Sequence, residues 1–456
     1  IPTLPVNSDA SHIVAPQPLY PFLLAARAQA NPLLVVTSSS RSAEDLVSEL
    51  RELHDNVLEF PAWETLPHER LSPRSDTVAR RIQTLYSLQQ AQAINPIVVT
   101  PVRGAIHRII SQLGKSPLVQ LEIGKEQSFD DLVRHLSSLA YTRTDLVERR
   151  GEFAVRGGII DLFLPLSHHP IRIDFFGDEI EDLSYFEVAD QRTFKPLIGA
   201  VDIYPCRELL LSPEIKHRAI EIADKYPAAA EMLSKIAEGI TFEGMESLIP
   251  LLIDETQSLL SRMPANTQLV FIDQQRIKSR AADLLATNEE FLNASWSNAA
   301  MGGSAPLHDG AGTYMAWDEL LDEIAQCGIT TRELSPFGTD LDPETTFLDF
   351  AAIDPMRGDI DRAIATLRQS LEEHRTVVFA THGHGMLERY AGILRGADLP
   401  VQISEKLLAT PTKGSIHLTT SVLAHGFESA TDQIFFMTER DLTGSKGSVK
   451  DAERLP

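Results

Sequence analysis

The tripeptide GKS at residues 114–116 is a partial match to a phosphate-binding motif. A P-loop reads GxxxxGK followed by Ser or Thr, because its backbone amides cradle the phosphates while the lysine and the hydroxyl serve the γ-phosphate and Mg²⁺. The leading glycine would fall at Ile109, and the GKS follows a helix-like segment where a strand is needed. A second pair, GK at 124–125, lacks both the leading glycine and the hydroxyl. These residues predict neither a nucleotide site nor any other bound cofactor in this chain.

Two histidines and two cysteines are the remaining candidates for metal ligands. His382 and His384, in THGHGM, are close enough in sequence to reach one ion, but no cysteine or carboxylate cluster accompanies them. We favour the alternative, a strand-to-helix turn with polar residues near the helix N-terminus. Cys206 and Cys327 lie far apart and have no His or Cys neighbour at ligand spacing. We expect both to be packing residues of a protein from a reducing cytoplasm, and we expect no metal site.

Hydrolytic chemistry finds no better support. The nucleophile elbow G-x-S-x-G is absent from the sequence. The acidic pairs at 178–179 and 181–182 are typical of a turn and a solvated edge rather than of a general acid and base. LVFID ends at Asp273 like a Walker B strand, but Gln274 stands where a catalytic Glu would, and a strand ending in Asp is common in any α/β protein. The sequence predicts that this chain is not an enzyme.

The elements that carry these residues alternate between strand and helix. A buried strand is expected at 33–37 (LLVVT), a helix at about 42–53 and another near 76–88, followed by a further strand–loop–helix unit from IVVT. Such alternation predicts parallel βαβ units and a doubly wound α/β domain. The stretch before the first expected strand–helix unit, where a P-loop belongs, reads APQPLYPFLLAARA, without Gly or Lys. This region has the pattern of an NTPase-like fold without its phosphate site.

Residues 141–193 depart from that pattern and read as a run of short strands. GEFAV, GGIIDLFLP, PIRIDFF and LSYFEV alternate or cluster apolar residues, and the breaks fall at Gly, Pro, His or Asp. The run carries Arg156 beside a Gly pair, and Arg172 and Phe176 on PIRIDFF. Residues four apart on one strand face the same side, so Arg172 and Phe176 should share a face.

Two interpretations of these three residues remain open on the pattern alone. In the first, Phe176 is core and the arginines form solvated salt bridges with Asp174, Asp178 or Glu179. In the second, they form a protein interface, because Arg and aromatic residues together are the composition expected at interface hot spots.

A resemblance favours the second interpretation. RGG-I-I-D-L-F followed by R-I-D-F-F-G-D-E-I resembles the second domain of the bacterial transcription-repair coupling factors, the Mfd family, and more distantly the matching domain of the excision-repair subunit UvrB. In that family this domain is the docking surface for UvrA. The resemblance implies that the UvrA-contacting positions fall on Arg156, Arg172 and Phe176.

Two further stretches resemble the same proteins. FPAWETLPHERLSPRSDTVARRIQTLYSL is close to an Mfd-family pattern but lacks the long Tyr-rich hairpin with which UvrB grips damaged DNA, and GITFEGMESL resembles both. The resemblance implies an α/β fold: a degenerate P-loop-NTPase-like (UvrB-like) parallel-sheet domain with an inserted mainly-β domain, followed by a small separate α/β domain. We expect the first half of the UvrB-like domain at 1–120, the inserted UvrA-docking domain at 121–206, the second half with a linker (residues 294–314) at 207–334, and the third domain at 335–456.

The resemblance also implies what lies outside this stretch. We interpret the chain as the N-terminal module of such a factor, because the RNA-polymerase-binding and motor domains follow it in the family. ATP, Mg²⁺, DNA and RNA polymerase are then partners of those absent domains, which make the intact protein an ATP-dependent DNA translocase that displaces stalled RNA polymerase. The docking surface is a candidate for intramolecular contact with the same domains.

Charge and composition limit the other function classes. The 456 residues carry a net charge of −23, which opposes binding to a phosphate backbone. This argues against a DNA-binding repair subunit of the UvrB type, and the missing P-loop argues against an NTPase or hydrolase with an unrecognised site. No apolar run approaches the ~18 residues of a membrane span, so we expect no membrane partner and a cytoplasmic protein.

Overall fold

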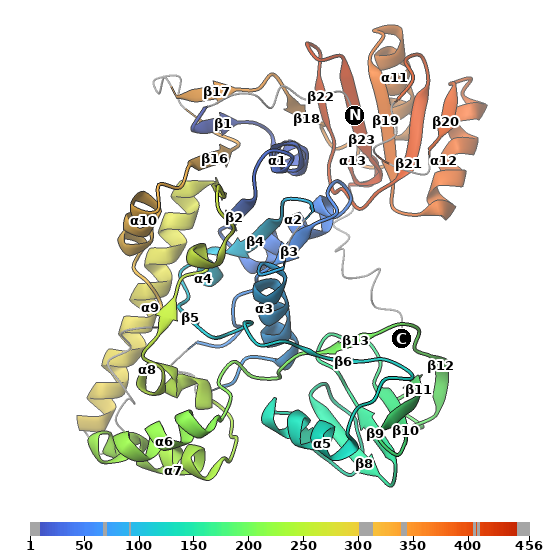
Figure 1. The fold of residues 1–456 in the computed structure, drawn as a ribbon. Coiled ribbons are helices and arrows are strands. Elements are labelled where there is room, and N and C mark those ends of the chain that lie inside the picture. The colour runs from blue at the N-terminus through green and yellow to red at the C-terminus, as the bar shows by residue number, and fades with distance from the viewer. Residues whose placement is uncertain are drawn as a thin grey trace.

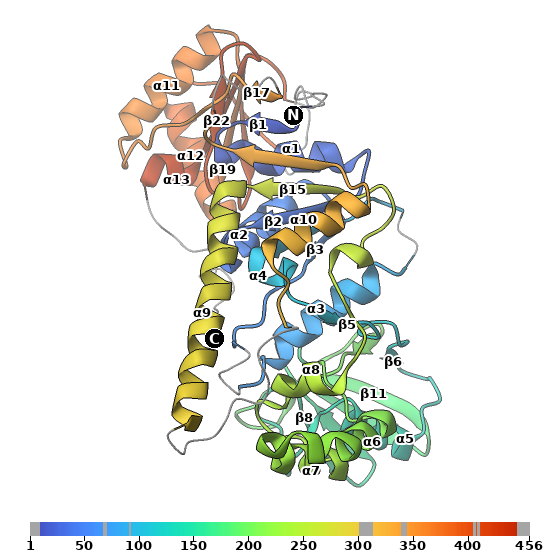
Figure 2. The same ribbon diagram turned by 90° about the vertical axis from the view of Figure 1, so that its left-hand side faces the viewer.

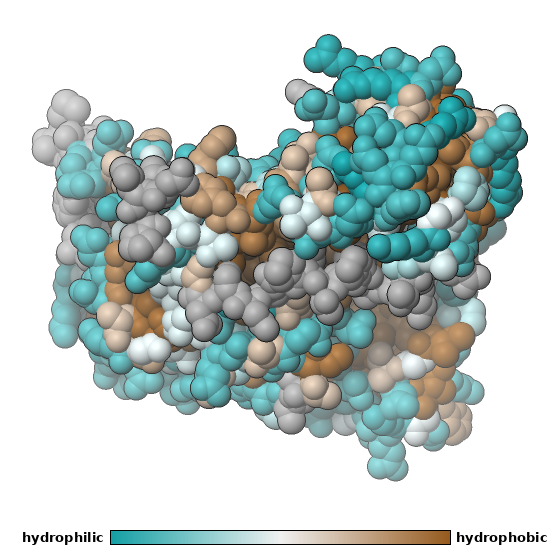
Figure 3. Space-filling view, turned by 90° about the horizontal axis from the view of Figure 1, so that it is seen from above, coloured by the Kyte–Doolittle hydropathy of each residue, from teal (hydrophilic) through white to brown (hydrophobic). Residues whose placement is uncertain are grey.

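The computed structural model describes residues 10–66, 71–90, 93–300, 313–338, 344–404, 407 and 411–444. Three large sheets organise it: a central sheet drawn mainly in blue, a green sheet at the lower right and an orange-red sheet at the upper right (Figure 1). Seen from above, the surface is mostly hydrophilic, with smaller apolar patches (Figure 3). Among the described residues, no helix is both long enough and apolar enough to cross a membrane.

The central sheet has seven strands, and every pairing in it is parallel. In spatial order the strands are β17 (Thr345–Phe347), β1 (His12–Val14), β16 (Thr331–Ser335), β15 (Gln268–Ile272), β2 (Leu33–Thr37), β4 (Ile97–Pro101) and β3 (Val57–Glu59). Val, Ile and Leu dominate two of its neighbouring strands, β2 and β4, which are buried along their whole length, as expected of strands covered on both faces. The predicted doubly wound α/β fold is confirmed.

Helices cover both faces of the central sheet. Along β2, Leu34 and Val36 belong to one hydrophobic cluster while Leu33 and Val35 belong to another, as the two-residue period of a strand requires. The covering helices are α1 (Tyr20–Ala28), α2 (Ser40–Leu50), α3 (Ser75–Ser87), α4 (Val102–Ala105), α9 (Gln274–Ala300) and α10 (Trp317–Gln326). The helices expected at 42–53 and 76–88 correspond to α2 and α3.

Helix α9 corrects one expectation. We expected a linker from residue 294, whereas α9 continues to Ala300 and extends well past the sheet (Figure 2). The reason is local: between Gln274 and Ala300 the sequence holds no Gly or Pro, and the first glycine comes at Gly302. The rest of the expected linker, 301–312, lies outside the described residues.

The second sheet has six strands, with antiparallel pairs except for β7 with β8. The four strands predicted from 151 to 188 all form. On one face, Leu132 and Leu136 of helix α5 (Phe129–Ser138) share a hydrophobic cluster with Ile160 and Ile173. The strands in order are β12 (Thr193–Pro196), β11 (Glu179–Phe186), β10 (Ile171–Phe176), β9 (Ile159–Leu162), β8 (Glu152–Arg156) and β7 (Thr142–Arg143).

The chain enters and leaves this β-rich unit at one place. Strand β6 (Val119–Leu121) leads in and pairs antiparallel with β13 (Val201–Ile203), which leads out. The helices α6 (Pro213–Ile222), α7 (Ala230–Glu238) and α8 (Ile249–Leu252) follow, and then β14 (Thr256–Gln257) pairs with β5 (Ile109–Ile110). The β-rich unit is therefore an insertion between two halves of the α/β unit, as the resemblance implies.

A buried ion pair between Arg81 and Glu208 lies where the chain leaves the β-rich unit and re-enters the α/β unit. Arg81 of α3 donates from Nε to Oε1 of Glu208 at 2.5 Å, and both side chains are almost completely inaccessible to solvent. Trp63 donates to the same oxygen at 2.9 Å, and the Arg81 guanidinium donates to the Pro61 carbonyl and to Nδ1 of His107. Burial and neighbouring cations hold the pKa of His107 well below its usual range, so its ring accepts this bond in the neutral form.

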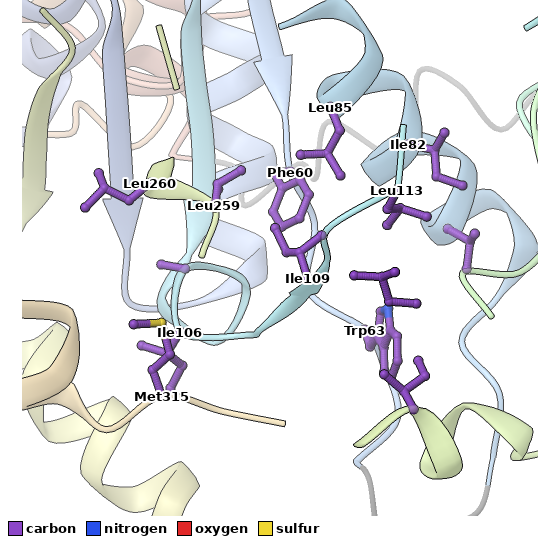
Figure 4. Close-up of a cluster of buried hydrophobic side chains, with 14 of the residues drawn as sticks. Phe60, Trp63, Ile82, Leu85, Ile106, Ile109, Leu113, Leu259, Leu260 and Met315 are labelled. Carbon is purple, nitrogen blue, oxygen red and sulfur yellow. The ribbon is translucent and has the colours of Figure 1, made fainter. Parts of the chain in front are cut away.

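Apolar side chains surround this polar network. Phe60, Ile109, Leu113 and Ile82 converge on the same interior, with Trp63 below them (Figure 4). The Arg81 guanidinium lies 4.2 Å from the centre of the Phe60 ring, which adds a cation–π contact. The return of the chain is thus held by a charge pair inside the hydrophobic core.

The third sheet combines parallel and antiparallel pairs. In order its strands are β18 (Ala351–Ala352), β22 (Phe427–Ser429), β23 (Ile434–Thr438), β19 (Thr376–Thr381), β21 (Ile416–Thr420) and β20 (Val401–Ile403). Its helices are α11 (Ile360–Glu372), α12 (His384–Gly396) and α13 (Glu439–Thr443). Although residue 345 lies in the range that we expected for the third domain, β17 pairs with β1, so the chain crosses between the two sheets after Phe347.

The third unit shares a hydrophobic core with the first. Phe22 of α1 meets Phe427 and Phe436 edge-on, with ring centres 5.2 and 5.7 Å apart. Beside this contact, Glu49 of α2 accepts a hydrogen bond from the backbone N–H of Ala424 at 3.1 Å. Burial here raises the pKa of Glu49 to about 7, even though that N–H favours the ionised form.

This shift predicts a pH-dependent stability. The folded protein favours the protonated form of Glu49, because its pKa is raised there above the unfolded value of 4.5. The contribution of this group to the free energy of unfolding is therefore complete at low pH and is lost as pH rises towards 7. Glu49→Gln keeps an acceptor for Ala424 and removes the titration. We expect it to stabilise the protein by roughly 2 kcal/mol at pH 8 and little at pH 5. Denaturant unfolding at both pH values measures this, with Glu44→Gln in the same helix as control; an equal effect at both pH values contradicts it.

Candidate protein-docking site

Alternation along β10 separates a core side from an outer side. Ile171 and Ile173 are fully buried towards α5, and Phe175 meets Phe129 of that helix edge-on at 5.1 Å. Arg172 and Phe176 occupy the intervening positions and therefore lie on the opposite face. The structure places both on one side of the strand, as their spacing predicts.

Arg172 is held in position by a buried carboxylate. Its Nε and Nη2 donate to the two oxygens of Asp161 at 2.7 and 3.0 Å, the bidentate geometry that fixes a guanidinium most firmly. Asp161 is directly opposite Arg172 in the ladder between β9 and β10 and is 1% exposed. The Phe186 ring lies 5.0 Å from the guanidinium. The hydrogen bond to Asp161 raises the pKa of Arg172.

Arg156 shares the same carboxylate. Its Nη2 lies 3.7 Å from Oδ2 of Asp161 and donates to the backbone oxygen of Asp145 at 3.3 Å, and 47% of the side chain is exposed. The first interpretation named Asp174, Asp178 and Glu179 as partners of the arginines. The structure shows Asp161 instead, because the strand register brings it opposite Arg172.

Phe176 ends β10 at the edge of this face. It is 78% exposed, so it is not core, which corrects the first interpretation. Gly177 follows it with φ +64°, a value that favours glycine and that turns the chain into β11. An exposed aromatic ring on the same face of a sheet as two arginines is the arrangement expected of a protein interface. We call Arg156, Arg172 and Phe176 the docking face.

Acidic residues border the docking face. Asp174 on β10 pairs with Asp182 on β11, and burial together with the charge of Asp182 raises the pKa of Asp174. Asp178 instead accepts from the backbone N–H of Phe129 at the start of α5, at 3.1 Å. The acids at 178–182 therefore lie in a turn and along β11, and Asp178 also caps α5; the turn was predicted from the pattern, whereas the cap was not.

Comparison with known proteins agrees with this geometry. A family profile described as the UvrB interaction domain matches residues 119–209, which contain the docking face. A transcription-repair-coupling factor of Mycobacterium bovis is 38% identical over 472 aligned residues, which cover 98% of this chain and 38% of that relative. The chain belongs to the transcription-repair-coupling factor family. Its relatives in Escherichia coli K12 and Bacillus subtilis 168 are 28% and 24% identical, over 92% and 93% of this chain.

This family member spans a little over a third of the length of those relatives, between 36% and 38%. The aligned stretch runs through all three sheets described above. Family membership therefore applies to the chain as a whole and not to the β-rich unit alone.

The position that a P-loop would occupy has a different lining in this family member. After β1 the chain passes through Pro16 and Pro18, which carry no backbone N–H to offer a phosphate. Phe347 and Phe350 line the same hollow of about 490 Å³. At the GKS motif, Gly114 has φ +74°, and a Cβ there would lie 2.8 Å from Leu85, so this glycine serves a close contact with α3.

The other candidates for chemistry have structural partners. Asp273, from the strand that resembles Walker B, caps α9 by accepting from the backbone N–H of Arg276 at 3.1 Å. The backbone N–H of His382 donates to Glu439 at 2.9 Å, and His384 begins α12. The described ranges contain no group of three or more His, Cys, Asp or Glu that could hold a metal ion. Cys206 is buried against Tyr141, and burial raises the pKa of its thiol to about 12. Cys327 is exposed, so the expectation that both cysteines are packing residues holds for Cys206 and is wrong for Cys327.

Sequence reasoning missed Asp161 and Phe186, which hold Arg172 from two sides. One sign was present: Asp161 is a lone charge inside the apolar run GGIIDLFLP. A charge within a buried strand requires a partner of opposite sign. The partner could not be chosen without the strand register.

Proposed function

We propose that this chain is a non-catalytic docking module that binds UvrA through the docking face. Within the residues matched by the UvrB interaction domain, an exposed Phe176 shares one face of the sheet with two arginines organised on a buried carboxylate. That juxtaposition is the observation that carries the proposal. Guanidinium groups already fixed in place lose little entropy on binding, and an exposed aromatic ring supplies the apolar anchor.

The wider role follows from family membership. In the intact factor, further domains would supply ATP hydrolysis, DNA translocation and contact with RNA polymerase, and this module would bring UvrA to the stalled complex. The prolines after β1 support the absence of a working nucleotide site here. We expect the isolated chain to show no ATP hydrolysis above background, and turnover that survives purification contradicts this part of the proposal.

UvrA binding by the isolated chain tests the proposal directly. We expect a 1:1 complex in titration calorimetry, and Arg172→Ala and Phe176→Ala should each weaken it by about tenfold or more, because truncating a central Arg or aromatic residue costs more than ~1–2 kcal/mol. Phe194→Ala is the matched control, since Phe194 is another exposed phenylalanine of this unit but lies on the edge strand β12.

Circular dichroism first establishes that each variant is folded, so that a change in affinity reports on the interface. A wild-type chain that does not bind UvrA overturns the proposal. Binding that Phe194→Ala weakens, while Arg172→Ala and Phe176→Ala leave it intact, moves the interface to the β12 edge and refutes the docking face.

A further inference from the structure

A cavity of about 450 Å³ lies where the inserted β-rich unit joins the α/β unit. Both connections between the units line it: Leu118 and Val119 on the way in, Leu209 and Leu210 on the way out. Ile82 of α3 and Leu113 face each other at its α/β side (Figure 4). Its size falls within the roughly 300–1,000 Å³ of ordinary small-molecule sites.

The charged side chains that line the cavity are acidic. Among the described residues that line it, two are glutamates, Glu208 and Glu255, and none is Lys or Arg. The charge of Glu208 is already compensated by Arg81 at 2.5 Å. Glu255 is exposed, so its carboxylate is the charge left to act on a guest. His135, also in the lining, has its pKa lowered by burial and stays neutral at neutral pH.

We propose that this cavity binds a compact apolar molecule carrying one positive charge, with Glu255 as the partner of that charge. Apolar walls favour burial of a hydrocarbon or aromatic body, because its surface is removed from water. An anion would lose its hydration beside two carboxylates without gaining a cation in return. The site is separate from the docking face, because His135 of helix α5 and Leu139, which follows that helix, line the cavity and lie on the other side of the sheet.

Such a guest touches both units at their junction. It would contact the two connections that set the position of the β-rich unit against the α/β unit. A ligand that binds only the folded protein also raises its thermal stability with concentration. Binding and thermal shift are therefore two independent readouts of one event.

Three naphthalenes of similar size and different charge test the proposal on the whole chain: 1-naphthylmethylamine, 1-naphthylmethanol and 1-naphthoate. We expect saturable binding in calorimetry, with the amine about fivefold tighter than the alcohol and the acid weakest. Glu255→Gln should remove the advantage of the amine and leave the alcohol within twofold of wild type. Binding of the acid as tight as the amine refutes the assigned charge.

A filling substitution locates the site. Leu118→Trp, or Ile215→Trp if the first variant unfolds, should abolish binding of the amine and the alcohol, while the neighbouring exposed Lys115→Trp should not. Neither filling substitution changes the net charge of the chain. Non-specific electrostatic attraction of the amine to the acidic protein would therefore be the same in these variants as in the wild type. Binding that persists in a folded Leu118→Trp protein, or the absence of saturable binding by all three compounds, overturns the proposal.

Discussion

Glu208→Gln is expected to lower the free energy of unfolding by about 3–5 kcal/mol. The substitution leaves the Arg81 guanidinium, which is inaccessible to solvent, without a counter-charge inside the hydrophobic core. It also weakens the hydrogen bond from Trp63. Guanidinium-induced unfolding, followed by tryptophan fluorescence, measures the loss.

Two comparisons isolate the cause. Arg81→Met combined with Glu208→Leu removes both charges, so the double variant should be less destabilised than Glu208→Gln alone. Arg41→Gln breaks an exposed pair with Asp45 at 3.9 Å and should change stability by less than about 1 kcal/mol. If the double variant is the least stable protein of the set, packing rather than uncompensated charge dominates at this position.

Asp161→Asn is expected to weaken UvrA binding by about tenfold or more, although Asp161 is 1% exposed and cannot form much of the contact itself. The amide offers one acceptor in place of two, so Arg172 loses its bidentate clamp and Arg156 loses its nearest carboxylate. Both guanidinium groups then lose conformational entropy when UvrA binds, which weakens the complex.

A double-mutant cycle tests this indirect role. If Asp161 acts through Arg172, then Asp161→Asn added to Arg172→Ala should cost little more than Arg172→Ala alone. Asp130→Asn, an equal charge change on α5 at the other face of the sheet, should leave affinity unchanged. Full additivity in the cycle would mean that Asp161 supports the fold or another contact rather than Arg172. Titration calorimetry supplies all four affinities.

Periodicity was sufficient for much of the architecture. The mostly apolar run LLVVT predicted a buried strand, and β2 has all five residues buried. Alternation in PIRIDFF put Arg172 and Phe176 on one side, because side-chain direction in a strand depends only on residue spacing. The docking residues themselves came from a resemblance, and their contact with UvrA stays a prediction.

The predictions that were wrong concerned contacts between residues that are distant in the sequence. Local sequence offered Asp174 as the partner of Arg172, but the register between β9 and β10 selected Asp161. No periodicity shows whether the ring of Phe176 has a neighbour to cover it. Similarly, α1 and the third sheet share one core through the contact of Phe22 with Phe427. These residues lie far apart in the chain, so local sequence could not predict that contact.

Because β6 pairs with β13, the β-rich unit has the geometry of an exchangeable domain. Val119 stands opposite Ile203, and paired Cα atoms in an antiparallel ladder are about 5 Å apart. The host chain is therefore interrupted at a single point and resumes almost where it left off. A single genetic event can insert, delete or exchange residues 119–203 without redirecting the chain on either side. The junction is accordingly the natural splice site for chimaeras that graft the docking surface of one protein onto the scaffold of another.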